Sequence, residues 1–136
     1  MVKKIDHIGI AVNNIEEQLI YYSEIMGLKV EKIETVPSEG VKVCFIAIGD
    51  THIELLEPIS DDSPIKKFLE KNGQGVHHIA YSTNDIVGEI VALKGKEFRL
   101  INEQPKQGAG GKLICFLHPK STFGVLTEIC QETEVH

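Results

Sequence analysis

Apolar residues alternate with polar or small residues along several short stretches of the chain. The stretch at residues 5–12 shows this most clearly, since Ile8, Ile10 and Val12 alternate with small residues and a histidine. A period of two is typical of a β-strand that packs one face against a core. Elsewhere apolar residues recur every three or four positions, which is typical of amphipathic helices. The pattern predicts strands at 5–12, 28–35, 41–48, 51–56, 76–83, 98–101, 113–117 and 124–130, and helices at 14–27, 64–72 and 86–94.

The first predicted helix has a recognisable start and stop. It begins at Asn14, with Glu17 three residues later in the position of a capping partner. Gly27 ends it. The apolar stripe that we expect to cover the first strand consists of Ile15, Leu19, Tyr22 and Met26.

The same order of elements occurs twice. Moving residues 75–86 back by 71 positions places His78 on His7 (78 − 71 = 7), and the apolar positions around them keep register. A second match places Glu128 on Glu54 at an offset of 74 (128 − 54 = 74). A repeated pattern of this kind indicates one structural unit used twice. We therefore predict a single domain over residues 1–136, with module one at 4–58, a linker helix at 59–75 and module two at 76–131.

The repeat gives each module one histidine and one acid at equivalent places. Alternation along the strands puts His7, Glu54, His78 and Glu128 on the face opposite the packing face. A single histidine or glutamate on a strand is more often half-buried or solvated than functional, but equivalence across the repeat favours a shared site. Two imidazoles and two carboxylates suit cobalt, nickel, zinc, manganese or iron, and leave two positions of an octahedron open. The expected fold is α+β, with tandem βαβββ modules forming a curved, barrel-like mixed sheet around a metal site.

Composition excludes several other classes of protein. The 136 residues are 42% hydrophobic and 25% charged, which is ordinary for a globular domain. A net charge of −6 argues against nucleic acid as a partner, because phosphate contacts need a basic surface. The chain has neither a signal-peptide core nor an apolar run long enough to span a membrane, so we expect a cytoplasmic protein. Cys44, Cys115 and Cys130 lie in apolar runs and read as buried, reduced thiols without zinc-ligand spacing.

Three further histidines and one loop are weaker candidates for a part in the predicted site. His77 lies on the face opposite to the candidate ligands and is interpreted as structural. His52 shares a face with Glu54, where it either lines the site or meets solvent; we expect solvent. His118 follows a strand end and is a candidate for substrate contact. The glycine-rich loop at 104–112 is either a lid over the site or a plain mobile hairpin.

The tandem modules and their four candidate ligands resemble the vicinal oxygen chelate superfamily over nearly the whole chain, residues 4–131. The histidine and acid pattern alone is equally similar to glyoxalase I. Other segments resemble methylmalonyl-CoA epimerases more specifically. These segments are residues 6–12, 53–58, 62–65 and 75–79, and above all 110–112, 116–120 and 124–128.

The resemblance implies a metal-dependent epimerase that interconverts (2R)- and (2S)-methylmalonyl-CoA by proton abstraction and return through a metal-stabilised enolate. It implies one divalent ion per chain, with cobalt preferred and nickel, zinc and manganese as alternatives. The implied ligands are His7, Glu54, His78 and Glu128.

Two bases are needed to remove a proton from one face of a carbon and return it to the other. The resemblance implies that Glu128 is both ligand and base. Some family members carry a second glutamate where this chain has Val43, which cannot transfer protons. We assign the second transfer to Glu54 and keep Glu39 as the reserve candidate; the residues that bind the rest of the substrate are not assigned.

The expected partner is a small acyl-CoA substrate, with neither nucleic acid nor membrane, and an open sheet built from two modules indicates a homodimer. Glyoxalase I, acting on the hemithioacetal of glutathione and methylglyoxal, is one alternative. A non-catalytic small-molecule-binding member of the superfamily is another, although such proteins usually lack the four ligands. An extradiol dioxygenase would have one carboxylate in the site, whereas two are present here.

Overall fold

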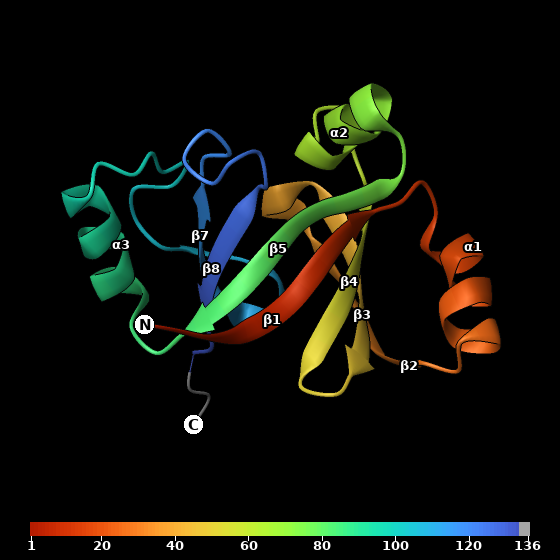
Figure 1. Ribbon diagram of the computed structural model, residues 1–136. Helices are drawn as coiled ribbons and strands as arrows, with labels where there is room; N and C mark the ends of the chain where they lie inside the picture. Colours follow the sequence, from red (N-terminus) through yellow and green to blue (C-terminus); the bar gives the residue numbers. More distant parts are fainter. Residues whose placement is uncertain (134–136) are drawn as a thin grey trace. The chain divides into compact units, whose positions relative to one another are not determined.

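The computed structural model describes residues 1–133. The chain is α+β, and each module has a helix after its first strand, as predicted (Figure 1). The first module comprises β1 (Val2–Ala11), α1 (Ile15–Leu19), β2 (Lys29–Val36), β3 (Val41–Ile48) and β4 (Thr51–Pro58). The second comprises β5 (Gly75–Thr83), α3 (Ile86–Gly95), β6 (Lys106–Gln107), β7 (Leu113–Leu117) and β8 (Thr127–Gln131).

The strands form one mixed sheet of eight, in the order β2-β3-β4-β1-β5-β8-β7-β6. In each module the first strand runs parallel to the last, as β1 does to β4 and β5 to β8. The pairings β2–β3, β3–β4, β6–β7 and β7–β8 are antiparallel. The predicted fold class and tandem βαβββ order are therefore confirmed.

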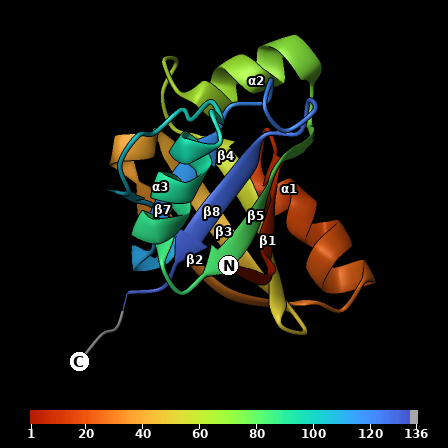
Figure 2. The same ribbon diagram turned by 60° about the vertical axis from the view of Figure 1, so that its left-hand side comes forward.

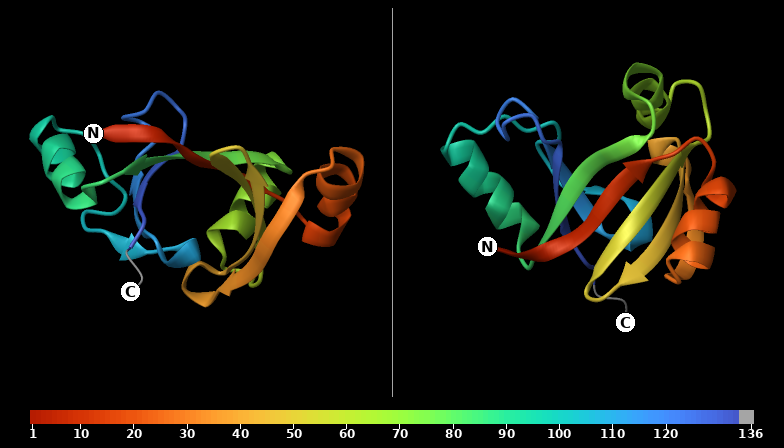
Figure 3. Two further views of the ribbon diagram at one scale, coloured as in Figure 1. Left: turned by 90° about the horizontal axis from the view of Figure 1, so that it is seen from below. Right: turned by 45° about the vertical axis from the view of Figure 1, so that its right-hand side comes forward.

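The chain divides into two compact units whose boundaries fall inside β1 and β5. The first-module unit is His7–His77, and the second-module unit is Met1–Asp6 with the residues from His78 onward. Consequently the first half of β1 belongs to one unit and its second half to the other. Within each unit the strands curl (Figure 3), as expected from the intrinsic twist of β-strands.

In the first-module unit, α1 covers one face of the strands as the alternation predicts. Its core cluster consists of Val12, Ile15, Cys44, Ile46 and Leu55, with Leu19 and Tyr22 packed against it. The backbone N–H of Glu17 donates to the Asn14 side chain at 3.0 Å, so the predicted N-cap is confirmed. This arrangement leaves the opposite face of β1 and β4 for the polar side chains.

The end of this helix differs from the prediction. The α-helix stops at Leu19, and the chain continues as a π-helical turn at Ile20–Ile25, in which the N–H of Met26 donates to the oxygen of Tyr21, five residues back. A π turn holds more residues than an α turn, so positions beyond it rotate away from the stripe. Met26 is therefore 54% exposed, and its predicted place on the buried stripe is wrong.

The linker helix α2 (Pro64–Asn72) has the predicted bounds. Ser63 caps it by accepting from the N–H of Ile65 at 3.2 Å, and Pro64 occupies the first turn. Gly73, with φ at 77°, ends the helix in a conformation that suits glycine. None of the helices in residues 1–133 has the length and apolar character needed to cross a membrane.

In the second-module unit, α3 lies over β7 and β8 (Figure 2). Its cluster consists of Ile86, Ile90, Cys115, Leu117 and Ile129. Ala80, Ile114 and Cys130 form a separate cluster with Phe116 packed against it. Ile129 and Cys130 thus face different clusters, which confirms the predicted alternation along β8.

The predicted strand at 98–101 is wrong. This segment forms only an isolated bridge between Leu100 and Leu117. The positive φ of Glu97, 63°, breaks the extended backbone before it. After it, the N–H of Phe116 donates to the Asn102 side chain at 2.8 Å, and such a side-chain acceptor competes with a strand ladder. The short β6, which pairs with β7 instead, lies inside the predicted loop.

The last strand starts later than predicted. The chain from 118 to 125 turns, with the N–H of Gly124 donating to the oxygen of Pro119 at 2.8 Å. Phe123 and Gly124 have φ angles of 57° and 94°, which no strand contains. The ladder of β8 therefore begins at Thr127 rather than at residue 124.

Candidate metal centre

The first-module unit contains one buried pair of a histidine and a glutamate. His7 Nδ1 lies 3.1 Å from Glu54 Oε2, and the two side chains are 4% and 5% exposed. The parallel register of β1 and β4 places Gly9 opposite Glu54, so the neighbouring position on β1 carries no side chain.

The second-module unit contains the equivalent pair. His78 Nε2 lies 3.3 Å from Glu128 Oε1, and both side chains are 5% exposed. The register of β5 and β8 places Ala80 opposite Glu128, as Gly9 is placed opposite Glu54. The predicted equivalence of the two modules therefore extends to side-chain contacts and burial.

A phenylalanine accompanies each acid, and the sequence prediction missed both. Phe45 is opposite Glu54 on β3, and Phe116 is opposite Glu128 on β7. The Phe116 ring also meets His78 edge to face, with centroids 5.3 Å apart. The 71-residue offset that relates the histidines also relates these two rings (116 − 71 = 45), so the repeat contained the signal.

The donor set fits a divalent ion. His7 and Glu54 in one unit, and His78 and Glu128 in the other, are buried side chains of the types that hold such an ion. Buried charges need partners of opposite sign, and imidazole nitrogens with carboxylate oxygens are ordinary ligands of first-row divalent metals.

The inert Val43 lies on β3, and the reserve acid Glu39 lies on the turn before it. Val43 is 1% exposed and faces Leu56 across the ladder, so this position is apolar. Glu39 is half-buried in the 3₁₀ turn Pro37–Glu39.

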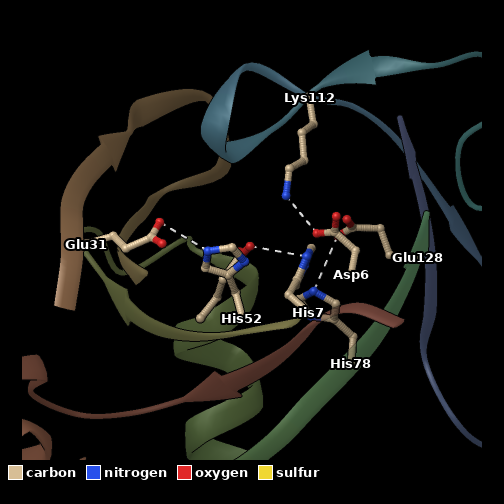
Figure 4. A network of polar contacts seen from close by, with 8 residues as sticks. Asp6, His7, Glu31, His52, His78, Lys112 and Glu128 are labelled. Carbon is tan, nitrogen blue, oxygen red and sulfur yellow. Dashed lines mark hydrogen bonds and ion pairs between the residues drawn. The ribbon is translucent and has the colours of Figure 1, made fainter. Parts of the chain in front are cut away.

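His52 is half-buried, so it meets solvent in part, and it also contacts Glu31. Its Nε2 lies 3.1 Å from Glu31 Oε2 (Figure 4). The register of β2 shifts between Val30 and Lys32, which marks a β-bulge at Glu31. Bulges redirect side chains, and this one directs a carboxylate to a histidine two residues before Glu54.

The other two histidines differ in setting. His77 packs edge to face on Phe68, with centroids 5.0 Å apart, which supports its structural interpretation. The Nδ1 atom of His118 accepts from the N–H of Lys120 at 3.1 Å. Desolvation, together with the nearby cations Arg99 and Lys120, lowers the pKa of His118, so the imidazole is neutral at pH 7.

A buried ion pair that the sequence prediction missed joins Lys112 to Asp6. Lys112 Nζ lies 2.7 Å from Asp6 Oδ1, with side chains 12% and 7% exposed (Figure 4). A strand period of two would place Asp6 on the packing face with Ile8 and Ile10, but its partners are polar. The Cys130 thiol also hydrogen-bonds Asp6, and burial, with the charges of Asp6 and Glu128, raises the pKa of that thiol.

The three cysteines are free and buried, as predicted. Desolvation also raises the pKa of Cys44 and Cys115. Each is therefore a thiol rather than a thiolate at neutral pH.

Comparison with known proteins places this geometry in a family. Residues 6–116 match the family described as the Glyoxalase/Bleomycin resistance protein/Dioxygenase superfamily. The chain belongs to this superfamily. The match includes His7, Glu54 and His78 and confirms the resemblance seen in the sequence, since this superfamily also includes the vicinal oxygen chelate enzymes.

Relatives within the superfamily cover almost the whole chain. The uncharacterized protein YqjC of Bacillus subtilis is 43% identical over 130 residues, which make up 96% of this chain and 93% of that protein. The ethylmalonyl-CoA/methylmalonyl-CoA epimerase of Cereibacter sphaeroides is 41% identical over 133 residues, 96% of this chain and 99% of the relative. A variant of Streptomyces coelicolor methylmalonyl-CoA epimerase, solved with 2-nitronate-propionyl-CoA, has a TM-score of 0.95 and 36% identity, covering 100% of this chain and 99% of that one.

Proposed function

We propose that the protein is a metal-dependent epimerase that interconverts (2R)- and (2S)-methylmalonyl-CoA. The observation that carries the proposal is the pair of buried His–Glu contacts on equivalent strands, His7 with Glu54 and His78 with Glu128. Relatives named as methylmalonyl-CoA epimerases, about 40% identical over more than nine-tenths of the chain, support the choice of substrate.

His7, Glu54, His78 and Glu128 would hold one divalent ion per chain, with cobalt preferred and nickel, zinc or manganese as alternatives. When bound, the ion acts as a Lewis acid that stabilises negative charge on the substrate oxygens. The burial of both His–Glu pairs excludes bulk water, which strengthens every charge interaction in the site.

Glu54 and Glu128 are the proposed proton carriers. Inversion at the carbon between the thioester and the carboxylate requires one group that takes the proton and another that returns one to the opposite face. The two acids occupy equivalent strands of different modules, which supports a two-base assignment. Val43 has no titratable group, and Glu39 is the reserve candidate for the second transfer.

The remaining parts of the proposal concern the protein as a whole. We propose a single domain that acts on an acyl-CoA substrate as a cytoplasmic homodimer, without nucleic acid or membrane partners. Lactoylglutathione lyase activity is the alternative, because the matching superfamily includes glyoxalases in its description and the histidine and acid pattern of this chain resembles glyoxalase I equally. A non-catalytic binding protein is the second alternative.

One assay separates these functions. The metal-loaded protein is incubated in deuterated water with (2S)-methylmalonyl-CoA and, in parallel, with the hemithioacetal of glutathione and methylglyoxal. We expect deuterium at the inverted carbon and formation of the 2R isomer, with negligible turnover of the hemithioacetal. The opposite ranking would identify a glyoxalase, and full activity after rigorous metal removal would contradict metal dependence.

A further inference from the structure

The connection between β7 and β8 is longer than its counterpart in the first-module unit. Gly49 and Asp50 alone join β3 to β4, whereas residues 118–126 join β7 to β8 (Figure 1). The offset that relates the modules changes from 71 at Phe116 to 74 at Glu128, so three residues are inserted between these two positions. The first module closes the same hairpin with a short turn, so the fold itself does not require the inserted residues. Loops carried on a rigid scaffold are a common place for binding residues.

This loop is fixed by hydrogen bonds. The N–H of Ser121 donates to the oxygen of His118 at 2.9 Å, and the N–H of Gly124 donates to the oxygen of Pro119 at 2.8 Å. The N–H of His118 also donates to the oxygen of Arg99, and the N–H of Arg99 donates to Ser121 Oγ, each at 2.9 Å. The loop and the segment at Arg99 therefore hold each other in place.

One side chain of the loop is exposed at a conformational cost. Phe123 is 99% exposed, and its φ of 57° lies in the left-handed region. A residue with a β-carbon adopts this region at a cost in free energy, which is smallest for asparagine and aspartate. Burial of the ring does not offset the cost, because nearly the whole ring meets solvent. The loop therefore presents an aromatic face to solvent in a defined place.

Two cations accompany the same loop. Desolvation, with the charges of Arg99 and Lys120, lowers the pKa of His118, so both cations lie close to this imidazole. Residues 118–126 contain no acid, although the chain as a whole has a net charge of −6. The loop thus carries positive charge on a protein that is negative overall, and it suits an anionic ligand.

We propose that Phe123, Arg99 and Lys120 bind the nucleotide end of the acyl-CoA substrate, with the adenine base on the ring and the phosphates on the cations. Aromatic rings stack on any nucleobase, and arginine and lysine are common partners of phosphate. The loop ends where β8 begins, and Glu128 is the second residue of that strand. The reacting carbon at Glu128 and the nucleotide at the loop are thus held by adjoining stretches of one unit. This inference rests on the function proposed above.

Substrate truncation tests it on the full, metal-loaded chain. The two substrates are methylmalonyl-CoA and methylmalonyl-pantetheine, which has the same reacting group but no nucleotide. We expect Phe123→Asn to lower the ratio of kcat/KM for the first substrate to that for the second by about tenfold or more, the range for loss of one base stacked on an aromatic ring. Asparagine adopts a positive φ readily, so this variant keeps the turn. Arg99→Met/Lys120→Met leaves the backbone contacts in place, and it should lower the same ratio and make it less sensitive to salt.

Two further variants serve as controls. Phe123→Tyr keeps the ring and should keep the wild-type ratio. Val91→Ala truncates a side chain that is 65% exposed on α3, and it should also keep that ratio. A wild-type ratio in Phe123→Asn overturns the proposal, whether both substrates lose activity alike or neither does. Loss of a dimer in Phe123→Asn at a wild-type ratio overturns it as well, and assigns Phe123 to contact with a second copy of this chain.

A binding measurement separates the inference from the proposed function. Calorimetry with adenosine 3′,5′-bisphosphate needs neither metal nor turnover, and we expect wild-type binding that weakens by about tenfold or more in Phe123→Asn. Such binding in a protein that does not epimerise methylmalonyl-CoA supports the inference and counts only against the proposed reaction. Epimerisation whose dependence on the nucleotide is unchanged in Phe123→Asn supports the proposed function and overturns the inference.

Discussion

Each glutamate of the candidate metal centre has a small residue beside it on one neighbouring strand and a phenylalanine beside it on the other. The small residues are Gly9 and Ala80, and the phenylalanines are Phe45 and Phe116. The small residue leaves space next to the carboxylate, and the ring excludes water from the other side. Such surroundings favour a carboxylate that is paired with a cation over one that depends on solvent.

Replacing His78 by alanine tests the ligand assignment. The imidazole is 5% exposed and lies beside Glu128, so its loss removes one donor and leaves the carboxylate without its histidine. We expect the bound ion to fall from about one per chain to near zero, since four protein ligands hold it in the proposed centre. Metal analysis of the purified variant measures this.

His77→Ala is the matched control. This neighbour packs on Phe68, and its loss costs about 0.5–1.5 kcal/mol of stability from the ring contact. The control should keep its ion. Wild-type metal content in His78→Ala would show that His78 is not a ligand.

The sequence predicted the four ligand candidates because each sits at an equivalent place in a repeat with a strand period of two. The Lys112–Asp6 pair could not be predicted in this way. Its partners are 106 positions apart and belong to no shared pattern. Alternation describes which face a residue occupies, but it does not describe which distant loop supplies a counter-charge.

At the scale of elements, both module helices begin with the same capping contact. Asn14 accepts from the N–H of Glu17, and Asp85 accepts from the N–H of Gly88, each at 3.0 Å. The 71-residue offset relates the two caps (85 − 71 = 14), so the repeat conserves how each helix starts as well as which face it buries.

Asn14→Ala removes the acceptor at the start of α1, and Asp85→Ala does the same for α3. Each should lower the free energy of unfolding by about 1 kcal/mol, the usual effect of losing an N-cap. Chemical denaturation measures the change. Met26→Ala serves as the control, because the Met26 side chain is 54% exposed and its truncation should change stability little. If Met26→Ala destabilised the chain more than Asn14→Ala, the described end of α1 would be wrong.

Most elements were predicted from the sequence to within a few residues, and two of the larger departures share a physical cause. Alternation and caps predicted β3, β7 and α2, whose limits match. The π turn after Leu19 depends on the hydrogen bond from the N–H of Met26 to the oxygen of Tyr21. The end of the predicted strand at 98–101 depends on the hydrogen bond from the N–H of Phe116 to the Asn102 side chain. Hydrophobic periodicity carries no information about such bonds.

At the scale of the whole molecule, each compact unit supplies one complete His–Glu pair. Asp6 and His7 are consecutive in β1 yet fall in different units. One strand therefore carries the Lys112-bound carboxylate of one unit and a candidate ligand of the other. A reaction that needs one proton carrier from each module requires both units, so the two acids should be separable by mutation.

Glu54→Gln and Glu128→Gln test this division between the modules. Glutamine keeps a carbonyl oxygen that can approach the ion but has no basic carboxylate, so both variants should retain the metal. Epimerisation should fall by about 10²-fold or more in each, the range for loss of a general base. Each variant should still exchange the proton of one substrate isomer with deuterated water, and the isomer should differ between the two. Proton NMR of each isomer measures exchange separately from inversion, so each variant is the control for the other. If Glu54→Gln epimerised at the wild-type rate, Glu54 would be a ligand only, and Glu39→Gln would then show whether the reserve acid carries the second proton.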